Sequence, residues 1–312
     1  MKNMLITRVL RGILTVFLAT LLVFMLLRVI PGDAATILAG PEATQEEIEA
    51  MREAWGLNQP LMTQFIIYIK KLVTGDVGMS YAYRTGTMLL TPASTLVWTR
   101  IPNTLLLALT ALVITVVAAV PIGVYTAKRP GGLLDNFINI SGFVLKAFPL
   151  FFVGIILMMV FGLRLKWLPT GGTGSFIHLI LPAVTLSAHE VVTLTRLTRT
   201  EVGRVMRSDH IRTARAKGLS SNVVLYKHAL RNVSIPLITN IGLRLGKLIN
   251  GAVVVETLFR WPGIGSLLVT SLNGRDYPVI QVLIPYAACV FVVVNLLVDL
   301  LYGVLDPRVT HK

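Results

Sequence analysis

The stretch RLTRTEVGRVMRSDHIRTARAKGLSSNVVLYKHALR, residues 196–231, decides the fold, because it interrupts a chain that otherwise consists largely of long apolar runs. It carries nine Lys and Arg residues against two acids, Glu201 and Asp209. Apolar segments lie on both sides of it, so this basic, helix-compatible stretch must stand in water between two membrane spans. The positive-inside rule predicts that it lies in the cytoplasm.

The composition is that of an integral membrane protein. Of the 312 residues, 54% are hydrophobic and 14% are charged, whereas soluble domains average about 25% charged residues. The mean hydropathy is +0.73. The net charge of +14 comes from basic residues in short loops between apolar runs, which is typical of topology signals and anionic-lipid contacts rather than of nucleic-acid binding. The single cysteine, Cys289, excludes a disulfide framework and a paired-thiolate metal site.

The apolar runs predict an all-α polytopic membrane protein with six transmembrane helices. The expected spans are residues 12–27, 101–127, 137–163, 177–197, 236–259 and 277–298. A cleaved signal peptide is an alternative for the first run, but its sixteen uncharged residues exceed the usual ~7–15 of a signal peptide. We therefore expect an uncleaved first span, and six spans return both termini to the cytoplasm.

Three regions are expected along the chain. They are residues 1–30, a cytoplasmic N-terminus and first span; residues 31–100, an extracytoplasmic segment; and residues 101–312, a core that includes the cytoplasmic loop 198–235.

The extracytoplasmic segment contains signals for two short helices. Thr44 to Glu47 reads as a capping box, and Gly56 is placed to end the helix that this box starts. Pro60 is expected to start an amphipathic helix that ends near Gly75.

The basic stretch itself is expected to form a helix, a glycine elbow and a second helix. Ser208 or Asp209 can cap the first helix, and Gly218 can end it in a left-handed conformation. The second helix is expected over 222–230, and Pro236 is expected to open the next span. Such an elbow fits a groove on a soluble partner. The alternative is an ordinary positive-inside loop in contact with lipid; a length of about 35 residues, against the usual 2–8, favours docking.

The segments DHIRTARAKGL (209–219) and KHALRN (227–232) resemble the EAA loop of ABC importer permeases. The resemblance is strongest to the oligopeptide/dipeptide/nickel permease family and to its first, B-type, membrane subunit. Further matching motifs occur in order along nearly the whole chain: LRVIPGD (27–33), GDVGMS (75–80), WLP (167–169), ETLFRWPGIG (256–265), DYPVIQ (276–281) and DPR (306–308). The family pattern Glu-Ala-Ala-x-x-x-Gly is met strictly only at Ala214 and Gly218, because Arg212 and Thr213 replace its first two residues.

The resemblance implies the type I importer permease fold, with a coupling helix that docks in a cleft of an ATPase. The implied coupling residues are Asp209, Arg212, Ala214, Arg215, Lys217, Gly218 and Leu219. It also implies the partners: a second permease subunit as a heterodimer, two ATP-binding subunits at the cytoplasmic face and an extracytoplasmic substrate-binding protein. ATP is then used by partner subunits, and this chain binds no cofactor. The implied location is a bacterial or archaeal plasma (inner) membrane.

No catalytic or metal site is expected. The nucleotide-binding pattern Gly-x-x-x-x-Gly-Lys-Ser/Thr is absent from the sequence, and His189-Glu190 lacks the second histidine of a zincin helix. Polar residues inside spans are candidates for the translocation path. They are Lys146, His189, Glu190, Arg244, Asn250 and Glu256, with Lys247 and Asn295 as further polar positions. Glu190 could line the path or pair with Lys146 or Arg244.

The expected function is a non-catalytic permease subunit that forms half of a translocation path for peptides or a related small solute. Import of nickel, a metal chelate or glutathione by the same type of complex is an alternative. A stand-alone secondary transporter is an alternative of another class, which would predict an inverted repeat and charges clustered at the midplane. A membrane-bound hydrolase lacks a nucleophile–base pattern.

Overall fold

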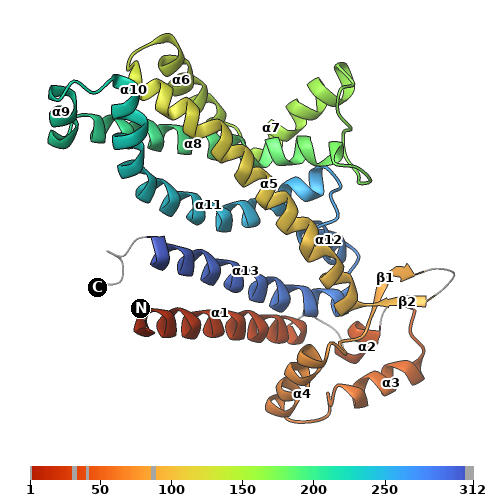
Figure 1. Ribbon diagram of the computed structural model, residues 1–312. Helices are drawn as coiled ribbons and strands as arrows, with labels where there is room; N and C mark the ends of the chain where they lie inside the picture. Colours follow the sequence, from red (N-terminus) through yellow and green to blue (C-terminus); the bar gives the residue numbers. More distant parts are fainter. Residues whose placement is uncertain (1, 30–33, 40–41, 86–88, 306–312) are drawn as a thin grey trace. The chain divides into compact units, whose positions relative to one another are not determined.

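A computed structural model describes residues 2–29, 34–39, 42–85 and 89–305 (Figure 1). Within these residues, five helices are long and apolar enough to cross a membrane, or six if one bent pair of helices is counted as a single span. The prediction of a polytopic all-α membrane protein is thereby confirmed. The chain divides into two compact units, residues 1–103 with 262–296 and residues 104–261 with 297–312, here called the first and the second unit.

The first unit contains the segment that was predicted to be extracytoplasmic and two long apolar helices. Its elements are α1 (Lys2–Val29), α2 (Ala34–Ala39), α3 (Gln45–Ala54), α4 (Leu61–Thr74), β1 (Met79–Thr85), β2 (Leu89–Pro92), the start of α5 (Ala93–Lys128), α12 (Ile264–Asn273) and most of α13 (Tyr277–Leu305). Aromatic side chains join them: the rings of Phe24 and Phe65 lie 5.0 Å apart, and the Tyr68 hydroxyl donates to the Gln281 carbonyl at 2.8 Å.

The predicted helix signals of this segment are confirmed. The Thr44 hydroxyl accepts from the Glu47 backbone N–H at 3.3 Å, and the Glu47 carboxylate accepts from the Thr44 N–H at 2.7 Å, which completes the capping box. Gly56, at φ +59°, follows the last cap residue of α3. Helix α4 begins after Pro60 and ends at Gly75, which is left-handed. The antiparallel pair β1–β2 and the short helix α12 were not predicted.

The second unit is a helical bundle around α8. Its elements are most of α5, α6 (Leu133–Ala147), α7 (Leu150–Leu157), the π-helical η1 (Met158–Arg164), α8 (Ile177–Met206), α9 (Asp209–Ala216), α10 (Ser221–Val223), the π-helical η2 (Val224–Ala229) and α11 (Leu230–Leu258). Helix α8 packs against α6, α7 and α11. Gly123 lets α5 approach α8 closely, because an added Cβ would lie 2.5 Å from the Thr198 Cβ.

The third span, predicted over 137–163 with an interruption at Pro149, is broken into two helices. Helices α6 and α7 meet at 108°. The cause is Pro149, which has no N–H to continue the helix and forces the residue before it, Phe148, into an extended conformation at φ −94° and ψ 137°.

The fifth span begins earlier than predicted. Pro236 does not open it but lies inside α11, and the helix runs without a loop from Ser221 to Leu258 through η2. Val233 and Leu237 belong to the buried core on either side of the proline, so tertiary packing holds a helix that propensity alone would interrupt. The predicted second helix of the basic stretch is therefore the beginning of this long helix.

Candidate functional site

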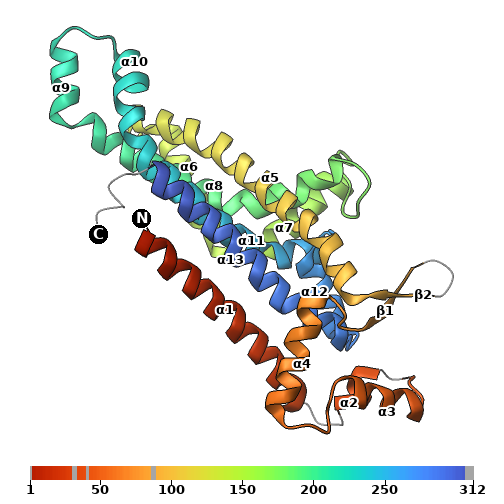
Figure 2. The same ribbon diagram turned by 60° about the horizontal axis from the view of Figure 1, so that its bottom comes forward.

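The basic stretch forms two short arms at one end of the second unit. Helix α8 continues to Met206, Ser208 precedes α9 in an extended conformation, and Gly218 turns the chain at φ +79° into α10. Figures 1 and 2 both show α9 and α10 side by side at this end, whereas α7 lies at the other end of the unit. The predicted helix–glycine–helix elbow is present, although the Ser208 side chain makes no capping hydrogen bond.

Helix α9 has a buried face and an exposed face. Ile211 (0% exposed) and Ala214 (7%) pack in a core with Val224 and Leu225 of the second arm. Ala214 thus packs inside the elbow. The exposed residues of the predicted coupling set are Asp209, Arg212, Arg215, Lys217, Gly218 and Leu219. Apolar packing fixes the elbow internally, so the face turned to solvent is a rigid surface of mainly basic side chains.

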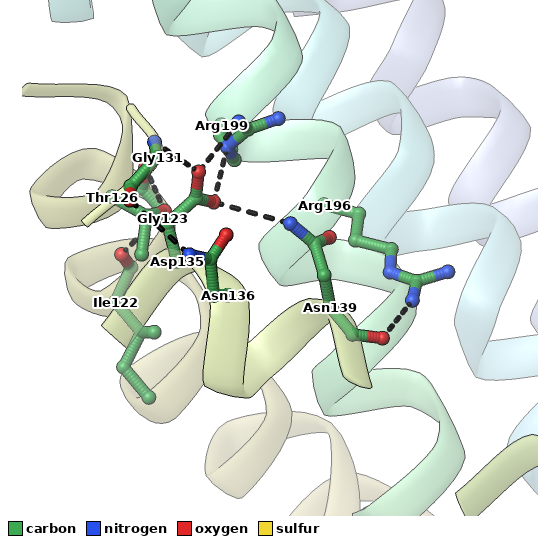
Figure 3. A network of polar contacts seen from close by, with 9 residues as sticks. All are labelled: Ile122, Gly123, Thr126, Gly131, Asp135, Asn136, Asn139, Arg196 and Arg199. Atoms are coloured by element: carbon green, nitrogen blue, oxygen red, sulfur yellow. Dashed lines mark hydrogen bonds and ion pairs between the residues drawn. The ribbon is translucent and has the colours of Figure 1, made fainter. Parts of the chain in front are cut away.

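An ion pair holds the base of this elbow to the turn between α5 and α6. The Arg199 guanidinium of α8 contacts both carboxylate oxygens of Asp135, at 2.5 and 2.7 Å (Figure 3). The Gly131 N–H donates to the same carboxylate at 2.8 Å. Asp135 is 3% exposed, and a buried carboxylate needs such partners. The turn is therefore bound to α8 about ten residues before α9 begins.

The contact between α6 and α8 continues from this pair as a seam. The Arg196 guanidinium donates to the Asn139 carbonyl at 2.7 Å (Figure 3). One turn further, Gly142 lies so close to α8 that an added Cβ would be 2.4 Å from Val192 Cγ1. At the end of α6, His189 Nε2 lies 3.0 Å from the Leu145 carbonyl, to which it donates. These contacts join α6 to α8 from Asn139 to Leu145.

The same turn also reaches the second arm of the elbow. The Lys128 ammonium lies 5.1 Å from the centre of the Tyr226 ring in η2, a cation–π distance. The residues on either side of the turn after α5 thus contact α8 through Asp135 and η2 through Lys128. The helix that leads into the elbow and the second arm of the elbow are both held at this turn.

The structure separates the predicted path residues into buried and exposed groups. Arg244 of α11 forms an ion pair with Glu190 of α8, with side chains 7% and 19% exposed, which selects one of the two partners considered for Glu190. Glu256 is fully buried and accepts from the Thr104 hydroxyl at 2.6 Å. Lys146 and Asn250 are exposed and lie apart from these pairs.

Sequence reasoning missed Asp135, Arg199 and Arg196 as a connected group. Asp135 follows the Gly131-Gly132 turn, and the two arginines were read only as part of the basic count. The available signal was the spacing of Arg196 and Arg199, which places both on one helix face. The partner Asp135 could not be found without knowing that α6 packs on α8.

The apolar bundle with an exposed basic elbow defines a class, the multi-pass membrane proteins. Residues 119–311 match the family described as "Binding-protein-dependent transport system inner membrane component", and residues 1–108 match the N-terminal family of such membrane components. The chain belongs to this family and is a permease subunit of a binding-protein-dependent ABC importer.

Relatives are similar over their whole length. The chain is 40% identical to the oligopeptide transport system permease protein AppB of Bacillus subtilis (strain 168), over 100% of both chains. It is 41% identical to the glutathione transport system permease protein GsiC of Escherichia coli (strain K12), again over 100% of both. A solved structure of the MetNI methionine ABC transporter in inward-facing conformations matches with a TM-score of 0.58 at 14% identity, over 69% of this chain and 98% of that one. That likeness shows the type I permease fold, and the named permeases are non-catalytic subunits.

Proposed function

We propose that this chain forms half of the translocation path of a peptide importer and that residues 209–219 dock on an ATPase subunit. The docking role is supported by the two different faces of α9, one buried and one exposed. Its apolar side chains are buried within the elbow, and Arg212 (side chain 78% exposed) and Arg215 are left on the outer surface. An exposed, mainly basic surface of this kind is suited to a groove of complementary charge.

The charge pattern gives the orientation of the chain. The nine Lys and Arg residues of 196–231 place the elbow and both termini in the cytoplasm under the positive-inside rule. The residues after 305 lie outside the described part of the chain. The extracytoplasmic segment then faces the substrate-binding protein, and a second permease subunit completes the path as a heterodimer.

Peptides are the proposed substrate class, because relatives of full length carry an oligopeptide and a tripeptide, glutathione, in their names. Import of nickel or a metal chelate is the second candidate by general resemblance, and we rank it lower because both of those names point to peptide-like solutes. A path that carries peptides must accept peptide groups and charged termini.

Charge reversal on the elbow tests the docking role. The complex of this chain with its partner subunits is reconstituted in liposomes, and ATP-driven dipeptide uptake is measured. In Arg212→Glu/Arg215→Glu, we expect uptake and binding-protein-stimulated ATP hydrolysis to fall about tenfold or more, equivalent to ~1.4 kcal/mol of lost docking energy. The matched control Lys227→Glu/Arg231→Glu makes the same charge change on the second arm, where both residues are exposed, and should change uptake less than about twofold.

Unchanged uptake in the first variant contradicts docking by α9. Uptake by this chain without any ATPase subunit contradicts the importer assignment and favours a stand-alone transporter.

A further inference from the structure

One face of α11 combines exposure with polarity in the middle of a membrane span. Five positions spaced by four and three residues are exposed, and they lie on one side of the helix: Leu243, Lys247, Asn250, Val254 and Thr257. Three of these five side chains are polar. The opposite side packs inside the subunit, with Leu248, Ala252 and Val255 all at most 2% exposed.

The exposed face of α5 is apolar along its middle. On α5, the exposed side chains at the same kind of spacing are Leu106 (47%), Leu109 (49%), Val113 (60%) and Val117 (67%). Such faces can meet hydrocarbon at no cost. A lysine at the centre of a lipid-facing helix costs ~2.5–3.5 kcal/mol on insertion scales, so the face of α11 is not built to meet lipid.

Lys247 is the central residue of this face. It lies 17 residues after Leu230 and 11 residues before Leu258, the two ends of α11. At 1.5 Å per residue the nearer end is about 16 Å away, so the side chain does not easily reach an interface. Within the described part of the chain, no carboxylate lies within ion-pair distance of its ammonium. Glu190 is paired with Arg244, which is buried on another side of α11. Among the residues that the structure describes, Lys247 is therefore a charge without a counterion.

We propose that this face of α11 borders the water-filled path and that the Lys247 ammonium binds the carboxylate of the solute in transit. Asn250 lies one turn further along the same face, and its amide both donates and accepts, which matches the N–H and C=O of a peptide group. The substrate class that fits a cation followed by an amide is a short peptide with a free terminal carboxylate. This inference rests on the proposed function and assigns Lys247 and Asn250 as the substrate-contacting residues of this subunit.

The first experiment measures water access in the assembled complex. Cys289→Ser removes the native thiol, and single cysteines are then introduced by Lys247→Cys, Asn250→Cys, Val113→Cys and Leu248→Cys. The probe is a charged, membrane-impermeant methanethiosulfonate, and modification of this chain is followed by mass. We expect the thiols at 247 and 250 to react at least about tenfold faster than those at the exposed position 113 and the buried position 248, because ionised thiols form in water and not in hydrocarbon. Equal rates at 247 and 113 overturn the proposal.

The second experiment tests the carboxylate contact. Under turnover with ATP, binding protein and a dipeptide, the substrate should slow modification of the Asn250→Cys thiol about tenfold, and adding Lys247→Gln should abolish this protection while Lys247→Arg retains it. If Lys247→Gln leaves protection intact, the ammonium does not bind the solute. If it instead separates the two permease subunits on size-exclusion chromatography, Lys247 pairs with the second subunit, and the proposal is wrong.

These outcomes are separate from a failure of the proposed function. A complex that imports no peptide contradicts the substrate class itself. A complex that imports peptide but shows neither labelling nor protection contradicts only the role of α11.

Discussion

Helices α5 and α11 are both long and both lie wholly or mostly in the second unit, yet their exposed faces differ in kind. The exposed face of α5 carries Val113 and Val117, whereas that of α11 carries Lys247 and Asn250. The difference teaches that exposure in an isolated membrane subunit has two meanings. An apolar exposed face is a lipid or subunit contact, and a polar one calls for water or a polar ligand.

The buried side of α11 adds a second contrast. Arg244 and Glu256 are also polar and lie within the same span, but each has a partner inside the subunit, Glu190 and Thr104. The polar groups of α11 therefore divide into buried groups paired with other helices and exposed groups on the outward face. Three predictions sharpen or break this division.

The largest effect is expected at the buried pair. Glu190→Ala leaves the Arg244 guanidinium buried without its counterion, which should destabilise the protein by about 3–5 kcal/mol. The measurement is the thermal unfolding of the purified complex in detergent, followed with the yield of folded protein. The double variant Glu190→Leu/Arg244→Leu removes both charges and should recover most of the loss. If the single variant is as stable as the parent, the pair is not structural, and Glu190 returns to the list of path residues.

A smaller effect is expected when the exposed faces are exchanged. Val113→Lys puts an ammonium on the apolar face of α5 and should cost ~2.5–3.5 kcal/mol of membrane insertion, seen as a lower yield of integrated protein. Lys247→Leu makes the opposite change on α11 and should leave the yield at or above that of the parent while reducing peptide uptake. Equal yields for Val113→Lys and the parent would mean that water reaches α5 as well.

The smallest effect is expected at the edge of the bundle, where charge pairs meet solvent. Asp135→Asn removes the bidentate contact to Arg199, a side chain that is 34% exposed, and should cost about 1.5–3 kcal/mol, since hydrogen bonds to charged groups contribute that much. We also expect more ATP to be hydrolysed per peptide imported, because α8 and the α5–α6 turn are no longer joined.

The control for this prediction is Glu201→Gln, which breaks the pair of Glu201 with Arg204 within one helix. It should change stability by about 0.5 kcal/mol or less. An unchanged ratio of ATP to peptide in Asp135→Asn would show that the turn takes no part in coupling.

The sequence was sufficient to predict features that depend on a few adjacent residues. The capping box at Thr44 and the left-handed Gly218 were both predicted and are both present, because cap and elbow geometry depend on a few adjacent residues. The number and order of the spans followed from apolar runs that only a bilayer can accommodate. The exposed basic face of α9 was also accessible, since charge and glycine position are visible in the chain.

Features that depend on packing between helices could not be predicted from the sequence. The role of Pro149 as a break and of Pro236 as a residue inside a helix could not be separated from sequence, because both prolines lie in apolar runs and only the neighbouring core decides. The pairing of Glu190 with Arg244 rather than Lys146 depends on which helices touch. Arg244 and Lys247 lie three residues apart, yet Arg244 is buried and Lys247 is exposed. This difference depends on how the helix is oriented in the bundle, which the composition does not show.

The π-helical segment η2 has a consequence for how the two ends of the long helix are aligned. In an α-helix each residue turns the chain by about 100°, and a π-helical turn holds more residues than an α-helical one. The segment Val224–Ala229 therefore offsets the angular phase between Tyr226, at the elbow, and Lys247, on the polar face. If the same six residues formed a regular α-helix instead, they would make more of a turn and would rotate one relative to the other. The elbow and the polar face would each remain intact, but the angle between them around the helix axis would change.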